Sequence, residues 1–235
     1  YHIEKDEVLV ELPVRVNFGG GWSDTPPYCN EHGGTVLNAA ISLNGTLPIV
    51  VEVKRIEKPV VVLASTDLGA EADFTDMSEL QNCNDPFDTF ALHKAALIAC
   101  GIIPREGEYT LQQLLDKVGG GLYLSTAVRG IPKGSGLGTS SMLAAACVKG
   151  IFEFIGKEIS ENELYSRVLC MEQIMSTGGG WQDQVGGLTP GVKLVHTIPG
   201  IKQNIQVDHI VVPEAAMEEL KERFALIYTG QRRLA

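Results

Sequence analysis

Glycine occurs in four tight clusters in this chain, and these clusters limit its possible folds more than any other feature. The 235 residues include 26 glycines, about 11% against an average of about 7%. Because they follow no period and bring little proline or serine with them, neither a collagen nor a disordered linker is indicated. Clustered glycine between apolar segments indicates backbone that turns tightly or approaches a ligand closely. The clusters lie at residues 19–21, 119–121, 134–138 and 178–180.

The charge balance limits the kinds of partner. The chain has 19 basic and 29 acidic side chains and a net charge of −10, whereas nucleic acids and anionic membranes attract basic surfaces. No apolar run approaches the roughly 18 to 20 residues that a membrane-spanning helix needs. We therefore expect no nucleic-acid partner and no membrane partner.

Cysteine spacing and the first residues indicate the compartment. The five cysteines are widely spaced and form no C-x-x-C pair, so neither a disulfide framework nor structural zinc is expected. The first six residues, YHIEKD, form a charged stretch with Glu4, Lys5 and Asp6, unlike a signal peptide, and lack a start Met. These features predict a cytoplasmic protein whose chain begins inside a longer one.

Hydrophobic periodicity predicts an α+β fold. Strands dominate the first third of the chain and helices the middle, which differs from the regular alternation of a doubly wound sheet. The composition, 44% hydrophobic and 20% charged, fits one sizeable domain or one domain plus part of another. The expected strands span residues 8–18, 47–54, 59–64, 122–128, 192–196, 205–212 and 224–229. The expected helices span residues 85–100, 141–155, 160–175 and 214–223.

The strongest chemical signal is the glycine-rich stretch 134–141, GSGLGTSS, which precedes an apolar helix. Its glycines allow successive N–H groups to form a concavity, and a helix N-terminus adds partial positive charge for an anion. The stretch is neither a Walker loop nor a G-x-G-x-x-G fingerprint, because Thr139 replaces the third glycine. Phosphate binding is the favoured interpretation, and the alternative is a glycine turn capped by hydroxyl side chains.

A second signal is the stretch 178–187, GGGWQDQVGG. Asp183 is surrounded there by glycines and apolar residues, and Glu172 precedes it by eleven positions. Two carboxylates beside a phosphate loop suit phosphoryl transfer, because one can hold a metal ion while the other orients or deprotonates the attacking hydroxyl. The alternative is that Asp183 only bonds its own backbone in a turn.

A third signal is the stretch 13–27, PVRVNFGGGWSDTPP. Arg15 alternates with valines and leads into a rigid Gly/Pro loop that carries Trp22 and Asp24. An aromatic face together with a carboxylate that accepts hydroxyl hydrogen bonds is a common way to hold a sugar. The alternative for Arg15 is an ordinary surface charge on a strand.

These three stretches, in this order, resemble the motifs of the GHMP kinase superfamily. Residues 13–24 match its first motif, and residues 132–140 match its phosphate-loop motif, P-x-x-x-G-L-G-[ST]-S. The resemblance implies the GHMP kinase N-terminal domain, a mixed sheet packed with helices, with ATP and Mg²⁺ as cofactors. It assigns ATP and phosphate binding to Lys133, Gly134, Ser135, Gly136, Leu137, Gly138, Thr139 and Ser140. It places Ser140 and Glu172 on Mg²⁺, makes Asp183 the base and Arg15 the group that stabilises the oxyanion, and gives substrate contacts to Trp22, Asp24 and Gly180.

The GGGWSDTPP and GGGWQDQ variants of these motifs are similar to the L-fucokinase group and its heptose-phosphate kinase relatives. This similarity implies an ATP-dependent sugar kinase that phosphorylates the anomeric hydroxyl of L-fucose to L-fucose 1-phosphate, for GDP-fucose salvage. The first alternative is a D-glycero-D-manno-heptose 7-phosphate 1-kinase, and an alternative of another class is a non-catalytic sugar or nucleotide sensor. The kinase of this group is often fused to a domain that makes GDP-fucose, so a fused guanylyltransferase is an expected partner.

The resemblance also divides the chain. Residues 1–213 would form the N-terminal, ATP- and sugar-binding domain, and residues 214–235 would begin a ferredoxin-like C-terminal domain. The third motif of the superfamily would then lie beyond Ala235, so the chain is expected to be truncated and its own activity is open. The cluster at residues 119–121 receives no role.

Overall fold

The larger of two sheets forms the floor of the molecule. The computed structural model describes residues 1–107, 109–132 and 134–231. In the larger sheet all neighbouring strands are antiparallel except one parallel pair, β5 and β7, which confirms the predicted mixed sheet. Its strands in spatial order are β1 (Glu7–Leu12), β4 (Ile49–Ile56), β7 (Gly121–Val128), β5 (Val61–Ser65) and β6 (Ala70–Phe74).

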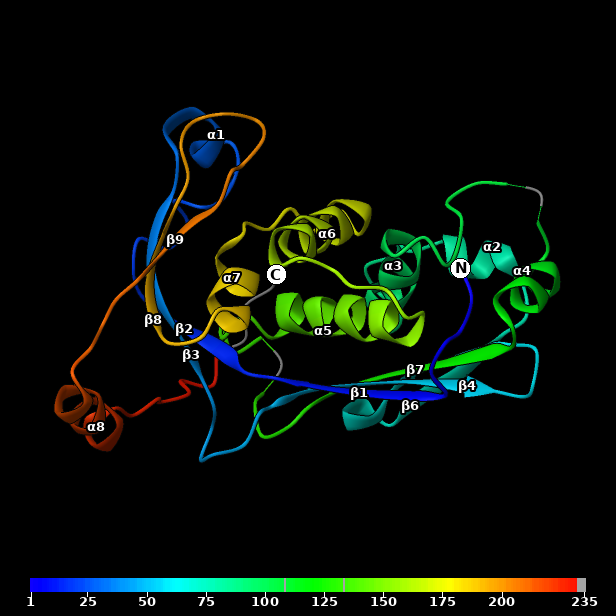
Figure 1. Ribbon diagram of the computed structural model, residues 1–235, viewed down its shortest axis with the longest axis horizontal. Helices are drawn as coiled ribbons and strands as arrows, with labels where there is room; N and C mark the ends of the chain where they lie inside the picture. The colour runs from blue at the N-terminus through cyan, green and yellow to red at the C-terminus, as the bar shows by residue number, and fades with distance from the viewer. Residues whose placement is uncertain (108, 133, 232–235) are drawn as a thin grey trace.

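A second, antiparallel sheet continues from the first. Pro13 separates β1 from β2, so the chain passes directly from one sheet into the other (Figure 1). The order in this sheet is β2 (Val14–Gly19), β3 (Thr35–Ile41), β8 (Val192–His196) and β9 (Gln206–His209). Arg15 and Asn17 alternate with the buried Val14 and Val16, and therefore share the face of the sheet opposite to these valines.

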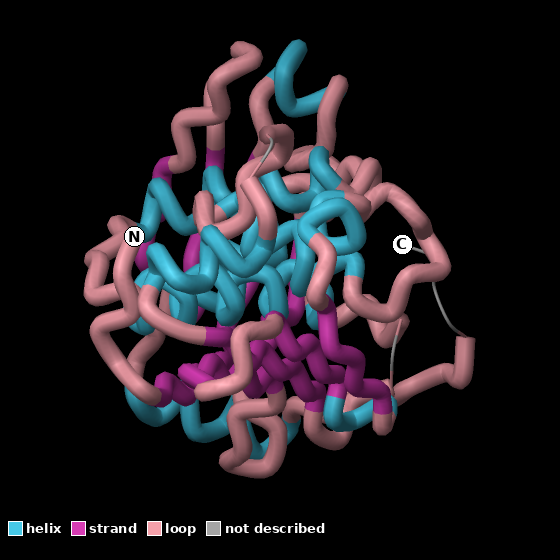
Figure 2. The backbone as a smooth tube through the Cα atoms, turned by 90° about the vertical axis from the view of Figure 1, so that its right-hand side faces the viewer, coloured by secondary structure: helices cyan, strands magenta, loops and turns pink. Residues whose placement is uncertain are grey.

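Helix α5 (Thr139–Phe154) lies at the centre of the helical layer. It packs against β1 and β4 and against α3 (Ala91–Ala99), α6 (Glu161–Ile174) and α7 (Gln182–Leu188). Figure 1 shows α3, α5 and α6 over one face of the larger sheet and α7 beside β2 and β3, and Figure 2 shows the helical layer above the strands. The remaining helices are α1 (Tyr28–His32), α2 (Met77–Gln81), α4 (Leu111–Val118), α8 (Glu214–Arg223) and the 3₁₀ turn η1 (Thr66–Leu68).

Apolar side chains of the larger sheet and of α5 form the main core. Val8, Val10 and Leu12 alternate inward along β1, and α5 is buried on most of its sides. Burying such a side chain contributes roughly 1.5–3 kcal/mol. A smaller cluster around the buried Trp181 joins α7 to the second sheet. The two clusters therefore hold α5 on the larger sheet and α7 on the second sheet.

Most predicted elements are confirmed, but the helix expected over residues 85–100 begins only at Ala91. The side chains of Asp85 and Asp88 accept hydrogen bonds from the backbone N–H groups of Phe87 and Phe90. Such local bonds favour turns over helix.

The strand expected over residues 224–229 is wrong. This stretch is irregular and exposed, and Phe224 stacks edge-on against Phe18 at a centroid distance of 6.2 Å. An apolar run needs a neighbouring strand to pair with, and these residues have none within the described chain. Helix α8 begins at Glu214, as predicted, and buries none of its side chains. The division of the chain at residue 214 and the start of a ferredoxin-like domain there stay predictions.

The cluster at residues 119–121 has a structural role. Gly119 ends α4 in the left-handed conformation, with φ 102°. A Cβ at Gly121 would lie 2.0 Å from the carbonyl oxygen of Lys58. Glycine is therefore required here because backbone passes close to backbone. None of the helices in the described residues is long and apolar enough to cross a membrane.

Candidate active site

The phosphate-loop stretch connects β7 to the central helix α5. Gly134, Gly136 and Gly138 have φ values of 78°, 79° and 73°, the left-handed conformation that turns N–H groups toward a common concavity. Gly138 precedes the helix and offers its first turn no side-chain cap. The backbone N–H groups of that first turn can therefore donate hydrogen bonds to an external anion. Lys133, predicted to bind phosphate, lies outside the described residues.

A serine in the first turn of α5 contacts two carboxylates. The Oγ of Ser141 donates to Oε1 of Glu172 at 2.7 Å, and Oδ2 of Asp183 lies 3.4 Å from the same hydroxyl oxygen. Glu172 comes from α6 and Asp183 from the first turn of α7. The structure thus brings together the two acids that the sequence analysis paired, through a residue that it did not assign.

Arg15 ties Asp183 to the phosphate loop. Its Nε and Nη2 both donate to Oδ1 of Asp183, the former at 2.8 Å, and its Nη1 donates to the carbonyl oxygen of Gly136 at 3.1 Å. The ion pair is mostly shielded from solvent, since 12% of the Arg15 side chain and 28% of the Asp183 side chain are exposed. The fork of the guanidinium therefore fixes the carboxylate in one orientation.

Asp24 lies next to this cluster and is 1% exposed. Its Oδ2 accepts from the backbone N–H of Gln182 at 2.9 Å, and its Oδ1 from the side-chain Nε2 of Gln182 at 2.8 Å. A Cβ at Gly180 would lie 2.1 Å from Oδ2 of Asp24, so glycine there lets the loop close over the carboxylate. Trp22, in contrast, is 70% exposed. Substrate contacts by Asp24, Gly180 and Trp22 stay predictions.

Helix α7 carries Asp183 and packs tightly on the second sheet. A Cβ at Gly186 would lie 2.9 Å from both Cβ and Cγ of Arg15. Lys193 is fully buried, and its Nζ donates to the carbonyl oxygen of Gly186 at 2.6 Å. The helix bearing the predicted base is thus seated closely on the strand bearing Arg15. The sequence pattern predicts no helix over residues 182–188, where three glycines precede α7 and two lie within it.

The comparison with protein families fits this arrangement. Residues 107–190 match the family described as GHMP kinases N terminal domain. The matched stretch includes the phosphate loop, Ser141, Glu172 and Asp183. The chain carries a GHMP kinase N-terminal domain.

Two of the proteins that resemble this chain are named as fucokinases. It is 42% identical over 226 residues to the bifunctional fucokinase/GDP-fucose pyrophosphorylase of Arabidopsis thaliana, covering 96% of this chain and 20% of the relative. It is 41% identical over 226 residues to the L-fucokinase/L-fucose-1-P guanylyltransferase of Bacteroides fragilis, covering 95% and 24%. The chain therefore spans about a quarter or less of the length of these relatives.

Similarity extends more weakly to heptose kinases. A D-glycero-alpha-D-manno-heptose 7-phosphate kinase of Campylobacter jejuni is 24% identical over 229 residues, covering 97% of this chain and 61% of the relative. The solved structure of a D-glycero-D-manno-heptose 1-phosphate kinase from Bacteriodes thetaiotaomicron superimposes with a TM-score of 0.64 at 20% identity, covering 90% and 62%. This likeness confirms the predicted fold of the GHMP domain.

Burial sets the protonation of the acids in the GHMP domain. Burial raises the pKa of Glu172 to about 7, against the opposing hydrogen bond from Ser141, and the charge of Asp183 adds to the rise. Burial also raises the pKa of Asp24, the N–H of Gln182 opposes this, and Asp183 again adds to it. A bound cation between these carboxylates would favour their charged forms.

The donor set fits Mg²⁺ delivered with a phosphate ligand. Oε2 of Glu172 is buried and has no hydrogen-bond partner within the described part of the chain, and hard oxygen donors are what Mg²⁺ prefers. Among the described residues no group of three or more His, Cys, Asp or Glu side chains could form a complete metal site. Mg²⁺ characteristically uses one or two carboxylates plus substrate phosphates and water.

Two side chains in this site were missed by the sequence analysis. Ser141, rather than Ser140, contacts Glu172; Ser141 is buried whereas Ser140 is exposed. The signal was present in the helical spacing, because Ser141 shares a stripe with the buried Ala145 and Val148. Gln182 was passed over because nothing in its own neighbourhood reveals a partner 158 positions away. The assignment of Ser140 to the metal stays a prediction.

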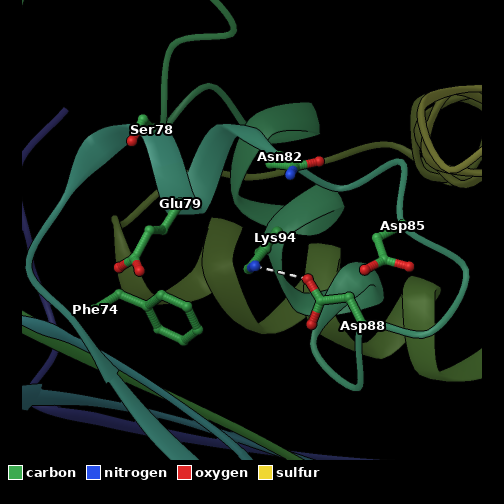
Figure 3. A pocket seen from close by; sticks show the side chains of 7 residues that line it. All are labelled: Phe74, Ser78, Glu79, Asn82, Asp85, Asp88 and Lys94. Carbon is green, nitrogen blue, oxygen red and sulfur yellow. Dashed lines mark hydrogen bonds and ion pairs between the residues drawn. The ribbon is translucent and has the colours of Figure 1, made fainter.

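A separate pocket of about 420 Å³ lies at the opposite end of the molecule from α7 (Figure 1). Figure 3 shows it between α2 and the start of α3, with Nζ of Lys94 paired to Asp88 at 2.6 Å and Glu79 beside the ring of Phe74. None of the residues that line it belongs to the glycine-rich stretches. It is therefore distinct from the phosphate loop.

Proposed function

We propose that this chain is the ATP- and sugar-binding part of a kinase that phosphorylates the anomeric hydroxyl of L-fucose. The observation that carries the proposal is the cluster of Arg15, Asp183, Ser141 and Glu172 at the uncapped start of α5. This places a phosphate loop, a candidate base and a candidate metal ligand within one hydrogen-bonded group. The two fucokinase relatives at 42% and 41% identity support L-fucose as the substrate.

In the proposed reaction the anomeric oxygen forms a bond to the γ-phosphorus of ATP, and the bond from that phosphorus to the bridging β–γ oxygen breaks. The products are L-fucose 1-phosphate and ADP, and the hydroxyl proton passes to Asp183. Oδ1 of Asp183 is occupied by Arg15, whereas Oδ2 has only the long contact to Ser141, so Oδ2 is the oxygen that can accept the proton.

Positioning and charge neutralisation supply most of the catalysis in such a transfer. The glycine-rich loop and the start of α5 would hold the phosphates, and Arg15 would stabilise the developing oxyanion beside the base. Glu172 with Ser140 or Ser141 would hold Mg²⁺, which when bound neutralises charge on the phosphates.

The same proposal covers partners and place of action. Both fucokinase relatives are named as bifunctional, which supports a guanylyltransferase fused to this kinase in the full-length protein. Fucose 1-phosphate made by one part would be the substrate of the other. A cytoplasmic location fits the supply of ATP and free sugar.

A heptose 7-phosphate is the rival substrate, supported by the Campylobacter jejuni relative. Its phosphate would need a free cation near the sugar loop. The three Lys and Arg residues in the first 54 positions are all paired with carboxylates: Lys5 with Glu153, Arg15 with Asp183, and Lys54 with Glu52 and Glu7. Within the first 54 positions, therefore, every Lys and Arg side chain already has a carboxylate partner and none is left over for a sugar phosphate.

The test measures ADP release by the full-length natural protein with Mg-ATP and a panel of sugars that includes L-fucose and the heptose 7-phosphate. We expect release with L-fucose and a product phosphorylated at the anomeric carbon by ³¹P NMR. The variant D183N should lose activity by orders of magnitude, whereas D208N, which alters an exposed aspartate on β9, should keep it. Release only with the heptose supports the rival, and sugar binding by calorimetry without ADP release supports a sensor.

A further inference from the structure

Asp24 is a buried acid without an ion-pair partner among the described residues. Its shortest hydrogen bonds come from Gln182, which donates from both its backbone N–H and its side-chain amide, whereas Oγ1 of Thr25 makes only a long contact of 3.5 Å with Oδ1. A buried carboxylate held only by neutral donors depends on each of them, because an unmade hydrogen bond to a charged group is costly.

Gln182 is itself fixed from two further directions. Its Oε1 accepts from Nδ2 of Asn17 on β2 at 3.2 Å, and its backbone carbonyl accepts from Nδ2 of Asn38 on β3 at 3.3 Å. A carboxylate cannot donate a hydrogen bond, so the side-chain NH₂ of Gln182, and not its Oε1, must face Asp24. The four polar groups of Gln182 are therefore all engaged, by three separate segments of the chain.

The position of Gln182 links two parts of the site. It is the first residue of α7 and directly precedes Asp183. Trp181, before it, provides no side-chain cap, so the N–H that Asp24 accepts is one that the helix leaves unpaired. A shift of the Asp24 carboxylate thus moves the start of the helix that carries the predicted base.

We propose that Gln182 is a positioning residue that holds Asp24 ready for the sugar and couples sugar binding to the orientation of Asp183. This inference rests on the proposed kinase function. Each carboxylate oxygen of Asp24 can accept a second hydrogen bond, so the two bonds from Gln182 leave capacity for sugar hydroxyls. Gln182 acts through Asp24 and touches no reacting atom.

The experiment is a double-mutant cycle with Q182M and D24N in the full-length natural protein, measuring KM for L-fucose, KM for ATP and kcat. Methionine keeps the length of glutamine but donates no hydrogen bond. Hydrogen bonds to charged groups contribute about 1.5–3 kcal/mol, so Q182M should raise KM for L-fucose at least tenfold. KM for ATP should change by less than threefold. KM for L-fucose in the double variant should equal that of D24N.

The matched control is Gln184, a buried glutamine two positions further along α7, whose Nε2 donates to the carbonyl oxygen of Gly180 at 3.2 Å and not to Asp24. Q184M should lower the thermal unfolding midpoint but change KM for L-fucose by less than threefold. An equal rise in KM for Q184M and Q182M would show general loosening of α7 and overturn the proposal. An unchanged KM in Q182M, or effects of Q182M and D24N that multiply, would also overturn it.

The wild-type protein separates this inference from the proposed function. If it releases no ADP with any sugar, the kinase proposal fails. The thermal unfolding midpoints of wild type, Q182M, D24N and the double variant, measured without ligand, then decide whether Gln182 holds Asp24. Midpoint shifts that are not additive support the contact, and additive shifts overturn it.

Discussion

Replacing Glu172 with glutamine tests how much the buried negative charge of Glu172 lowers the free energy of unfolding. Burial raises the pKa of Glu172 from its ordinary value of 4.5 to about 7. At about 1.4 kcal/mol for each pKa unit, the difference corresponds to about 3 kcal/mol. Because the folded protein binds this proton more tightly than the unfolded chain, the contribution of Glu172 to the free energy of unfolding is greatest below about pH 4.5. It falls as the pH rises to about 7 and is then lost.

The assay is urea unfolding of wild type and E172Q at pH 5 and pH 8, with a chelator to remove divalent cations. Ser141 can still donate to the oxygen of the glutamine, but the buried position of Oε2 now holds an NH₂ without an acceptor, which costs about 1–3 kcal/mol. That cost does not depend on pH. Part of the effect is already present at pH 5, which is above the unfolded pKa, so the stability of E172Q relative to wild type should improve by about 2–3 kcal/mol between pH 5 and pH 8.

Glu153, which pairs with Lys5 and is half-exposed, provides the control, because E153Q should show the same difference from wild type at both pH values. A change of less than about 1 kcal/mol for E172Q between the two pH values, well below the roughly 2–3 kcal/mol expected from linkage, would refute the argument. Adding Mg²⁺ at pH 8 should stabilise wild type more than E172Q, since the cation binds the carboxylate only in the native state.

Three further outcomes are expected. In D183N, kcat for ADP release should fall at least about a thousandfold, because this variant lacks the carboxylate that we propose as the general base. G186A should lower the free energy of unfolding by about 1–3 kcal/mol, because its Cβ would overlap Arg15. In the control G19A the new Cβ meets nothing within 4 Å in the described chain, so it causes no such overlap. Urea unfolding compares the two variants. Burial lowers the pKa of Lys193 to about 8, so between pH 7 and pH 9 the folded protein loses this proton while the unfolded chain keeps it. Raising the pH from 7 to 9 should therefore stabilise wild type relative to K193M by about 1 kcal/mol. The absence of this trend in urea unfolding would mean that Lys193 is exposed.

The parts of this molecule that sequence patterns predict are those fixed by neighbours in the chain. The hydroxyl of Ser160 caps α6 through the N–H of Glu163, and the glycine-rich loop runs into α5 as its motif requires. Both depend on bonds that span a few residues. The expected helix start at residue 85 failed for the same kind of reason, because two Asp side chains there bond the backbone in turns and compete with helix.

The parts that could not be predicted depend on distant pairing. Strand β3 lacks a clear alternation, and its place is set by β2 on one side and β8 on the other. Helix α7 contains two glycines, which disfavour helix, and packing against β2 and β3 outweighs this. The Asp24–Gln182 contact joins two stretches that the motifs had singled out separately, but its geometry depends on both sheets being formed. Motif spacing identified Glu172 and Asp183, whereas the partner between them came from the packing of α5.

The pairing of Arg15 with Asp183 across 168 positions has a consequence for biosynthesis. At roughly 5–20 residues per second, Arg15 is synthesised roughly 8–34 s before Asp183. Strand β3 waits almost as long for β8, and during this time its free edge can pair with other chains. Contacts so distant in sequence form slowly. The contact between Arg15 and Asp183 is therefore among the last that a nascent chain can form. Until it forms, the unpaired edge of β3 in the second sheet is exposed to aggregation.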